Sequence, residues 1–389
     1  MLNADLTPKG VRGVSNNGKD LQKPGEQMFR ISREQAVELS IPIVAVLLAL
    51  LLGAFLILFI GRSPQEAYSA LLQGAFGSKR DIAETLINVT PLIFTGLSVA
   101  FSFKCGLFNI GAEGQFIMGQ IVAAWIGFQL TGLPTVIHMP LAFLLGAFAG
   151  GLWAALPGYL KAKLGVHEVI NTIMMNYIAL YFSHYLVMGV LKEPGPIPQT
   201  PPVVAAARLW KILPGTRLHF GLILALGAVW LVYYLLFKTT LGYEIRAVGI
   251  NPHAARYGGI NVSRDIIIAM SISGALSGAA GAVQALGVQF RFLDLFGFVG
   301  YGFDGIAVAL LGRNHPFGVL IAATLFGTLA RGAITMQSIA KIPKQIIGII
   351  QATIVIIVAA DEVLRRLLKS RSPGTQASVD AGEVERDGE

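Results

Sequence analysis

The chain is poor in charged residues and nearly lacks cysteine. Only 13% of its 389 residues are Asp, Glu, Lys or Arg, and 54% are hydrophobic, whereas ordinary soluble domains have about 25% charged residues. The one cysteine, Cys105, excludes an intrachain disulfide and a zinc site built from cysteines. This composition is typical of an integral membrane protein and excludes a soluble enzyme with a single membrane anchor.

Apolar runs of about 20 residues recur along the whole chain, which is the length a helix needs to cross a bilayer. The runs are continuous rather than alternating, and this pattern favours helices over a transmembrane barrel. The sequence therefore predicts an all-α integral membrane protein with about ten transmembrane helices. The expected spans are 41–60, 82–103, 112–131, 139–157, 169–190, 219–237, 266–288, 293–312, 316–334 and 345–363.

The distribution of basic residues sets the expected orientation. An even number of spans puts both termini on one side, and the positions of Lys and Arg favour the cytoplasm for that side. We expect residues 1–27 to be a disordered cytoplasmic tail, 28–365 the transmembrane domain and 366–389 a second cytoplasmic tail. The net charge of +8 follows from basic loops and needs no nucleic acid to explain it.

The two longest connections are expected on opposite faces of the membrane. Residues 192–218 are rich in proline, and we predict that they are external and extended. Residues 238–265 are predicted to be cytoplasmic and to contain a helical stretch. A third connection, 63–77, has proline near its start and is expected to form a short helix along the outer surface.

Two glycine-rich acidic segments interrupt the apolar pattern. They are Phe108-Asn-Ile-Gly-Ala-Glu-Gly-Gln115 and Phe298-Val-Gly-Tyr-Gly-Phe-Asp-Gly305. Each opens or breaks an expected span, and the two spans run in opposite directions across the membrane. An inverted internal repeat has this arrangement, and we expect spans 2–5 to be related to spans 7–10.

Four polar residues within the expected spans have two interpretations each. Asp304 lies in the middle of a span, where a carboxylate is costly unless it faces a cavity or a partner. It either lines a translocation path or caps the half-helix that follows. Glu113 lies between glycines and has the same two interpretations. Asn171 and Asn176 either bond between helices or contact a polar solute.

No pattern of residues indicates an enzyme. A zinc-protease helix needs His-Glu-x-x-His, but the run that begins with His167 has Asn at position 171, so no metal site is predicted. No nucleophile elbow is present either. The spacings Gly146-x-x-x-Gly150 and Gly274-x-x-x-Gly278 instead predict closely packed helices.

The cytoplasmic connection contains a distinctive glycine-rich stretch at 242–259. Its residues predict a helix around 243–248, a break at Gly249, a second short helix from Asn251, and a stop at Gly258. A short amphipathic element of this kind either docks into a groove of another protein or lies against the lipid surface.

Three stretches resemble permease subunits of ATP-binding-cassette importers in the ribose and branched-chain amino acid group, and within it the nucleoside and simple-sugar branch. They are Gly106-Leu-Phe-Asn-Ile-Gly-Ala-Glu-Gly-Gln115, Gly302-Phe-Asp-Gly305 and Glu244-Ile-Arg-Ala-Val-Gly-Ile-Asn-Pro-His-Ala-Ala-Arg-Tyr-Gly-Gly259. The resemblance covers about residues 40–365. It implies a multi-pass protein of the bacterial cytoplasmic membrane with about ten helices.

The resemblance also implies partners. These are a second permease subunit, the same or homologous, a cytoplasmic ATPase subunit and an extracytoplasmic substrate-binding protein. ATP and Mg²⁺ would bind to the ATPase, so no cofactor is expected on this chain. The family's coupling helix falls on residues 242–259, and the expected ATPase contacts are Glu244, Arg246, Gly249, Asn251, Ala255 and Gly258.

The expected lining of the translocation path follows from polarity and predicted depth. It comprises Asn109, Glu113, Gln115, Asn171, Asn176, Gln284, Phe298, Tyr301 and Asp304. The resulting hypothesis is a permease subunit that carries nucleosides or related simple sugars, driven by a partner ATPase. The alternative is an ion- or proton-coupled secondary carrier, which would use Asp304 and Glu113 as ion sites and need no ATPase.

Overall fold

The computed structural model describes residues 33–370, and side chains from 42 to 360. By its contacts the chain divides into residues 1–40 and a compact unit of residues 41–389, and the description below concerns the second unit. The predicted tail 1–27 lies outside the described residues, as do residues 371–389 of the predicted tail 366–389.

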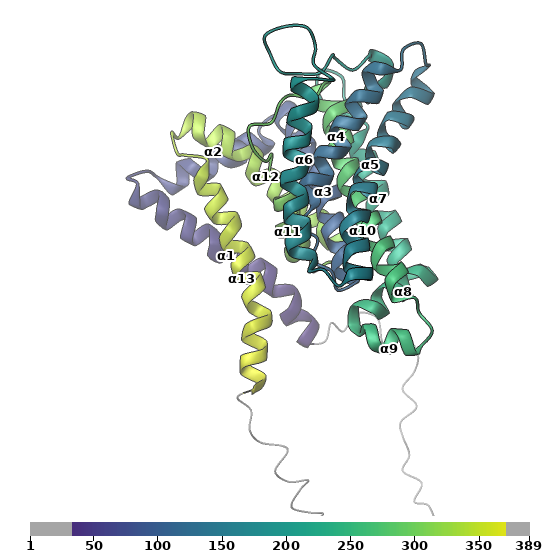
Figure 1. Cartoon of the computed structure of the whole chain (residues 1–389). Helices are drawn as coiled ribbons and strands as arrows, with labels where there is room; N and C mark the ends of the chain where they lie inside the picture. Colours follow the sequence, from purple (N-terminus) through teal and green to yellow (C-terminus); the bar gives the residue numbers. More distant parts are fainter. Residues whose placement is uncertain (1–32, 371–389) are drawn as a thin grey trace, which may run out of the picture. The chain divides into compact units, whose positions relative to one another are not determined.

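The described chain is a bundle of helices (Figure 1). The helices are α1 (Arg33–Phe59), α2 (Pro64–Phe76), α3 (Lys79–Lys104), α4 (Ala112–Gln129), α5 (Thr135–Leu164), α6 (Glu168–Met188), the 3₁₀ helix η1 (Ala205–Ala207), α7 (Gly221–Lys238), α8 (Thr240–Ile250), α9 (Pro252–Tyr257), α10 (Val262–Val283), the π-helix η2 (Gln284–Gln289), α11 (Tyr301–Leu311), α12 (Pro316–Ile339) and α13 (Gln345–Ser370). The prediction of an all-helical protein is confirmed.

Six helices within the described residues are long and apolar enough to cross a membrane. They are Pro42–Phe59, Lys79–Lys104, Thr135–Leu164, Gly221–Lys238, Val262–Gln289 and Pro316–Ile339. Two shorter apolar helices are Tyr301–Leu311 and Gln345–Ala360. The chain is therefore a multi-pass membrane protein, and the number of ten spans stays a prediction.

The centre of the bundle is built on backbone-to-backbone contact between α5 and α10. A methyl group on Gly150 would lie 2.5 Å from the carbonyl oxygen of Gly274, and one on Gly278 would lie 2.7 Å from the carbonyl oxygen of Gly146. Larger side chains at these four positions would push the helices apart. The close packing predicted from the glycine spacing is confirmed.

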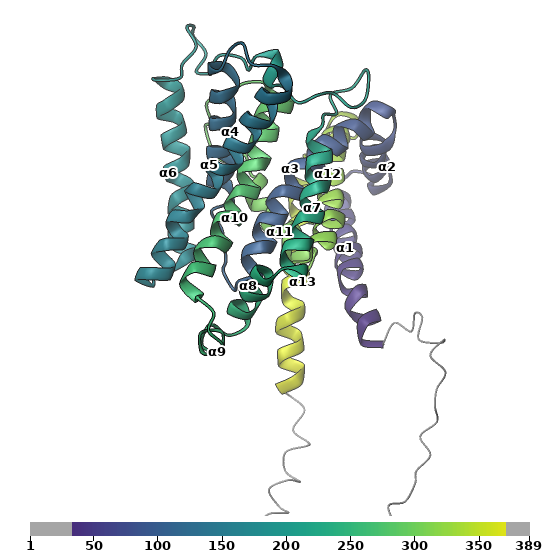
Figure 2. The same ribbon diagram turned by 90° about the vertical axis from the view of Figure 1, so that its right-hand side faces the viewer.

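Helices α3–α6 and α10–α13 make matching contacts. α3 packs against α11 and α12, as α10 packs against α4 and α5. α4 contacts α6, and in the second set α11 contacts α13. In the same way α5 contacts α6, and α12 contacts α13. α3 and α10 contact each other, as do α4 and α11. Figure 2 shows the same bundle from the side, with α3 and α10 near its middle.

Several predicted boundaries move in the structure. The span expected at 293–312 is helical only from Tyr301, because its first part is an irregular segment. The break expected at Gly249 is wrong. Gly249 lies inside α8, and the two short helices are separated at Asn251, whose side chain caps α9. The short helix expected within 63–77 is α2.

Candidate functional site

The two half-helices α4 and α11 begin beside each other, each after an irregular segment. Glu113, in the first turn of α4, is fully buried. One of its carboxylate oxygens accepts a hydrogen bond from the backbone N–H of Gly300 at 2.7 Å, and the other from that of Gly302 at 2.6 Å. These N–H groups belong to the start of α11, where a helix has free donors and a positive dipole end. Glu113 therefore caps the opposite half-helix.

The segment before α4 is held by a buried amide pair. The side chains of Asn109 and Gln115 exchange two hydrogen bonds, of 2.9 and 3.0 Å. Asn109 also donates to Ser273 Oγ on α10 at 2.9 Å and accepts from the N–H of Gly111 at 2.9 Å. In this conformation both predicted path residues are buried and fix the start of α4 against α10.

Asn176, on α6, also holds the start of α4 in place. Its Oδ1 accepts from the N–H of Gly114 at 2.7 Å, and its Nδ2 donates to the carbonyl oxygen of Ile110 at 2.9 Å. This is the interhelical alternative for Asn176. Asn171, one turn earlier, is half-buried, and its Nδ2 is buried without a hydrogen bond in the structure.

Asp304 differs from these residues because its side chain is exposed. It lies in the first turn of α11, and no described group donates a hydrogen bond to its carboxylate. Phe303, which precedes Asp304 in the chain, belongs to an aromatic group: Phe298 meets Tyr177 edge-on at 5.1 Å and Phe303 edge-on at 5.5 Å between ring centroids. Tyr177 and Phe303 are 45% and 38% exposed. An unpaired acceptor and accessible ring surfaces thus occur together at the start of α11.

The remaining predicted path residues are more enclosed. Tyr301 packs its ring 5.5 Å from that of Phe116. Gln284 is buried at the start of the π-helix η2. The end of η2 is tied to α4 by a hydrogen bond of 2.5 Å from Gln120 Nε2 to Gln289 Oε1.

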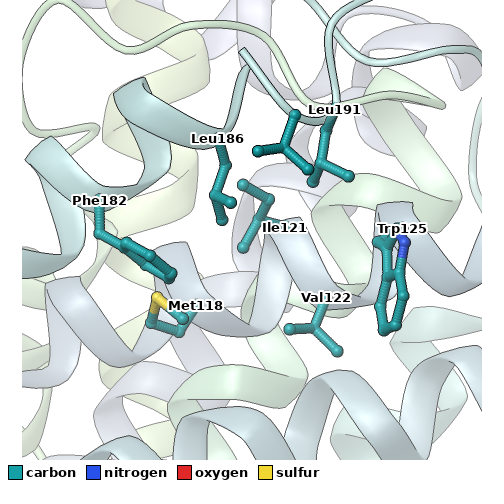
Figure 3. A pocket seen from close by; sticks show the side chains of 8 residues that line it. Met118, Ile121, Val122, Trp125, Phe182, Leu186 and Leu191 are labelled. Carbon is teal, nitrogen blue, oxygen red and sulfur yellow. The ribbon is translucent and has the colours of Figure 1, made fainter. Parts of the chain in front are cut away.

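A pocket of about 290 Å³ lies between α4 and α6, and its lining is apolar (Figure 3). Apart from the indole N–H of Trp125, its side chains offer no strong hydrogen-bonding group to a polar solute. The lining residues are Met118, Ile121, Val122, Trp125, Phe182, Leu186, Val190 and Leu191. This pocket is therefore no candidate for recognising a polar solute. In the described part of the chain, no three His, Cys, Asp or Glu side chains gather as a metal ion would require.

A second region lies at the end of the bundle formed by α8 and α9 (Figure 1). An open groove of about 530 Å³ runs along these two helices. It is lined by Thr240, Tyr243, Glu244, Ala247, Ile250, Asn251, Ala254, Ala255, Gly258 and Ile260. Within this lining Ile250 is 86% exposed, and Tyr257 on α9, outside the lining, is 95% exposed. Two large side chains at this end of the bundle are therefore almost fully exposed.

Of the predicted coupling residues, Asn251, Ala255 and Gly258 shape α9. Asn251 Oδ1 accepts from the N–H groups of His253 and Ala254 at 3.0 and 3.1 Å. Ala255 is buried, and Gly258 is the C-cap of α9. Asn251 and Gly258 therefore set where this short helix begins and ends.

The other three coupling residues attach α8 to the bundle. Glu244 pairs with Arg264 at the start of α10, and Arg264 also bonds the buried Asp265 at 3.0 Å. A methyl group on Gly249 would collide with the carbonyl oxygen of Lys104, at the end of α3. Arg246 packs over an aromatic ring at the end of α7. These three residues connect the groove to three different helices.

The sequence matches the family described as "Branched-chain amino acid transport system / permease component" over residues 82–359. The chain belongs to this permease family. It is a transport subunit and not an enzyme. The resemblance to ATP-binding-cassette permeases is confirmed, and it favours such a permease over a secondary carrier.

Three relatives match most of the permease. It is 44% identical over 332 residues to the guanosine ABC transporter permease protein NupP of Bacillus subtilis, covering 84% of this chain and 94% of the relative. It is 38% identical to the nucleoside ABC transporter permease protein NupB of Lactococcus lactis, covering 84% and 92%. It is 33% identical to the glucose ABC transporter permease protein TsgB13 of Haloferax volcanii, covering 84% and 88%. No solved structure matches the permease.

The sequence analysis missed several residues that complete these two regions of the permease. Ser273 and Ser277 on α10 hydrogen-bond to Asn109 and to the carbonyl oxygen of Ala112, respectively. Each serine directly precedes a glycine of the Gly274-x-x-x-Gly278 pattern. That pattern predicted the contact between helices, but it was not extended to the neighbouring serines. Arg264 and the exposed Ile250 and Tyr257 gave no such signal, because their roles depend on tertiary contacts and exposure.

Proposed function

We propose that this permease imports nucleosides or related simple sugars across the bacterial cytoplasmic membrane. The observation that carries this proposal is its identity, over 84% of the chain, to permeases named for guanosine and for nucleosides. The relative named for glucose has lower identity, 33%. Nucleosides are therefore the first substrates to test, and sugars the second.

The partners in this proposal follow from the same family. A cytoplasmic ATPase subunit, which binds ATP and Mg²⁺, docks in the groove along α8 and α9. The exposed Ile250 and Tyr257 support this location, since an apolar surface in water is stabilised by a partner. A second permease subunit, the same or homologous, completes the path, and an extracytoplasmic substrate-binding protein delivers the solute at the end formed by residues 192–218.

The proposed topology has ten spans, both termini in the cytoplasm and an inverted repeat. The matched contacts of α3–α6 and α10–α13 support the repeat. The two half-helices α4 and α11, with their N-terminal ends joined through Glu113, are the broken elements that such repeats place near the middle of the membrane.

We assign different roles to the proposed path residues. Asp304, Phe298 and Tyr301 surround the start of α11, where the exposed carboxylate accepts hydrogen bonds from a solute and the nearby rings supply stacking surface. These contacts are weak enough for a neutral solute to be released again after it binds. Asn109, Glu113, Gln115 and Asn176 hold the two half-helices in place. Asn171 and Gln284 border the path from α6 and η2.

A substrate panel tests the proposal. Membrane vesicles that contain the permease with its ATPase, second permease and binding protein take up labelled guanosine, adenosine, uridine, ribose or glucose in separate assays. We expect ATP-dependent uptake of at least one nucleoside that exceeds uptake of both sugars, and inhibition by excess unlabelled nucleoside. Uptake of the sugars without any nucleoside would overturn the nucleoside assignment.

A further inference from the structure

Three basic side chains gather at one end of the bundle, where α3, α7, α8 and α12 meet. Lys104 is in the last turn of α3, Arg246 is on α8, and His315 directly precedes α12. All three are half-buried. We call these residues the basic cluster, and we infer that it binds the phosphate group of an anionic phospholipid in the inner leaflet. This inference rests on the proposed function only in taking the end with α8 and α9 as cytoplasmic.

Aromatic rings hold the basic cluster together. The Arg246 guanidinium lies 5.0 Å from the centroid of the Phe237 ring, and the His315 ring lies 5.5 Å from the same ring. His315 also packs against Tyr233 at 6.0 Å and against Phe317 at 5.8 Å. Arg246 and His315 are therefore fixed around one phenylalanine at the end of α7.

Lys104 belongs to the same group. The Gly249 backbone on α8, one turn after Arg246, packs directly on the carbonyl of Lys104. Burial lowers the pKa of His315, and the positive charge of Lys104 lowers it further. The charges of Lys104 and Arg246 thus form one positive region, and the His315 imidazole borders it.

The cluster lacks a described counter-ion. None of the ion pairs among the described residues includes Lys104, Arg246 or His315. Glu244, two positions before Arg246 on α8, is already paired with Arg264. The two half-buried cations, Lys104 and Arg246, are unfavourable without an anion, since both desolvation and mutual repulsion raise their free energy. A bound anion would offset both costs.

The surroundings favour a lipid over a free anion. By helical spacing, Trp230, Tyr234 and Phe237 share one side of α7, and the first two rings stack at 5.7 Å. On α12, Phe317 begins an exposed apolar stripe that continues with Ile321, which is 72% exposed. α7 and α12 pack against each other, with α8 at the same end (Figure 2). Aromatic rings at the polar boundary and an apolar surface beyond it suit a headgroup and its acyl chains.

The chemistry of the cluster specifies a phosphate. Lys and Arg donate charge-assisted hydrogen bonds to phosphate oxygens, and basic pockets between helices on the cytoplasmic side bind anionic headgroups. A zwitterionic lipid carries the same phosphate but no net charge, so it should bind more weakly. Phosphatidylglycerol and phosphatidylcholine therefore form the informative pair of probes.

Native mass spectrometry of the purified transporter assembly tests this inference. Phosphatidylglycerol, phosphatidylcholine and inorganic phosphate are titrated separately. We expect tighter binding of phosphatidylglycerol than of phosphatidylcholine. Lys104→Gln should weaken phosphatidylglycerol binding about fivefold, the equivalent of the roughly 1 kcal/mol that one basic residue contributes near an anionic surface. Arg246→Gln should have a similar effect, and Lys104→Arg should retain binding.

Lys163→Gln is the matched control. Lys163 is an exposed residue near the end of α5, and a hydrogen bond of 3.3 Å from Ser263 to Ala162 places it at the same end of the bundle. Equal affinity for both lipids, or equal loss in the Lys163 and Lys104 variants, would overturn the inference. Saturation by inorganic phosphate with no preference for phosphatidylglycerol would overturn the lipid assignment. Lipid binding is measured without transport, so its failure is distinct from failure of the proposed import.

Discussion

Glu113 is the residue on which the junction of the two half-helices depends. Its two carboxylate oxygens satisfy two backbone donors that come from a segment 187 and 189 positions further along the chain. The sequence allowed the prediction that this glutamate caps a helix start. It did not reveal that the helix is α11, because hydrophobic periodicity carries no information on contacts between such distant segments.

Substitutions of Glu113 should destabilise the permease in a graded order. Glu113→Gln keeps one acceptor oxygen, whereas Glu113→Ala removes both and leaves two buried N–H groups without partners, at about 1–3 kcal/mol each. We expect melting temperatures in detergent to fall in the order wild type, Gln, Ala. Equal melting temperatures for the Gln and Ala variants would contradict the capping role.

Gly302 provides an independent test of the same junction. A methyl group at this position would collide with the backbone of Glu113, whereas one at Gly297 would meet nothing within 4 Å. Gly302→Ala should therefore lower thermal stability by an amount typical of overpacking, about 1–3 kcal/mol, and Gly297→Ala should not. Thermal unfolding of both variants, followed by size-exclusion fluorescence, measures this difference. Equal losses in the two variants would show that the close crossing of α4 and α11 is absent.

At the scale of elements, most apolar helices were predicted well, and the span expected at 293–312 was predicted less well. α3 and α7 lie within three residues of their expected spans, because a continuous apolar run needs only local information. α5 and α12 begin within four residues of the expected start, but they end seven and five residues later than expected. The expected span 293–312 is helical only from Tyr301 because its first part makes contacts with distant segments, such as the hydrogen bond from Asp294 N–H to the carbonyl oxygen of Pro198. Tertiary contacts there override an apolar sequence.

In the two short helices α8 and α9, too, the local sequence predicts capping but not tertiary contacts. Asn251 and Gly258 were correctly predicted to bound α9, since both act through local capping. Gly249 was expected to interrupt the helix, but it continues α8, because its missing side chain is needed for contact with the end of α3. A single sequence does not distinguish a glycine that allows two helices to approach closely from a glycine that allows a turn.

Gly249→Ala should therefore reduce coupling between the ATPase and transport. The added methyl group would force α8 away from the carbonyl of Lys104 and shift the groove. The control is Gly227→Ala on α7, where a methyl group meets nothing within 4 Å. We expect severalfold slower ATP-dependent uptake for Gly249→Ala at normal membrane levels, and unchanged uptake for Gly227→Ala. Normal uptake by the Gly249 variant would contradict a role for this contact.

For the whole molecule, function was easier to predict than the site. The three glycine-rich stretches were enough to indicate a permease of the correct family. The path residues were chosen by polarity and depth, and polarity does not separate a side chain that holds the fold from one that faces a solute. In the structure Asn109 is enclosed in hydrogen bonds and Asp304 is exposed, although both appeared equal in the sequence.

The central claim is that this chain forms a path that is powered by a separate ATPase through α8 and α9. The most direct measurement is labelled guanosine uptake into proteoliposomes, with the complete assembly and with the permease chains alone. The account predicts uptake only with the complete assembly and ATP, and no uptake with a proton or sodium gradient in place of ATP. Gradient-driven uptake by the permease chains without the ATPase would contradict the account and support a secondary carrier.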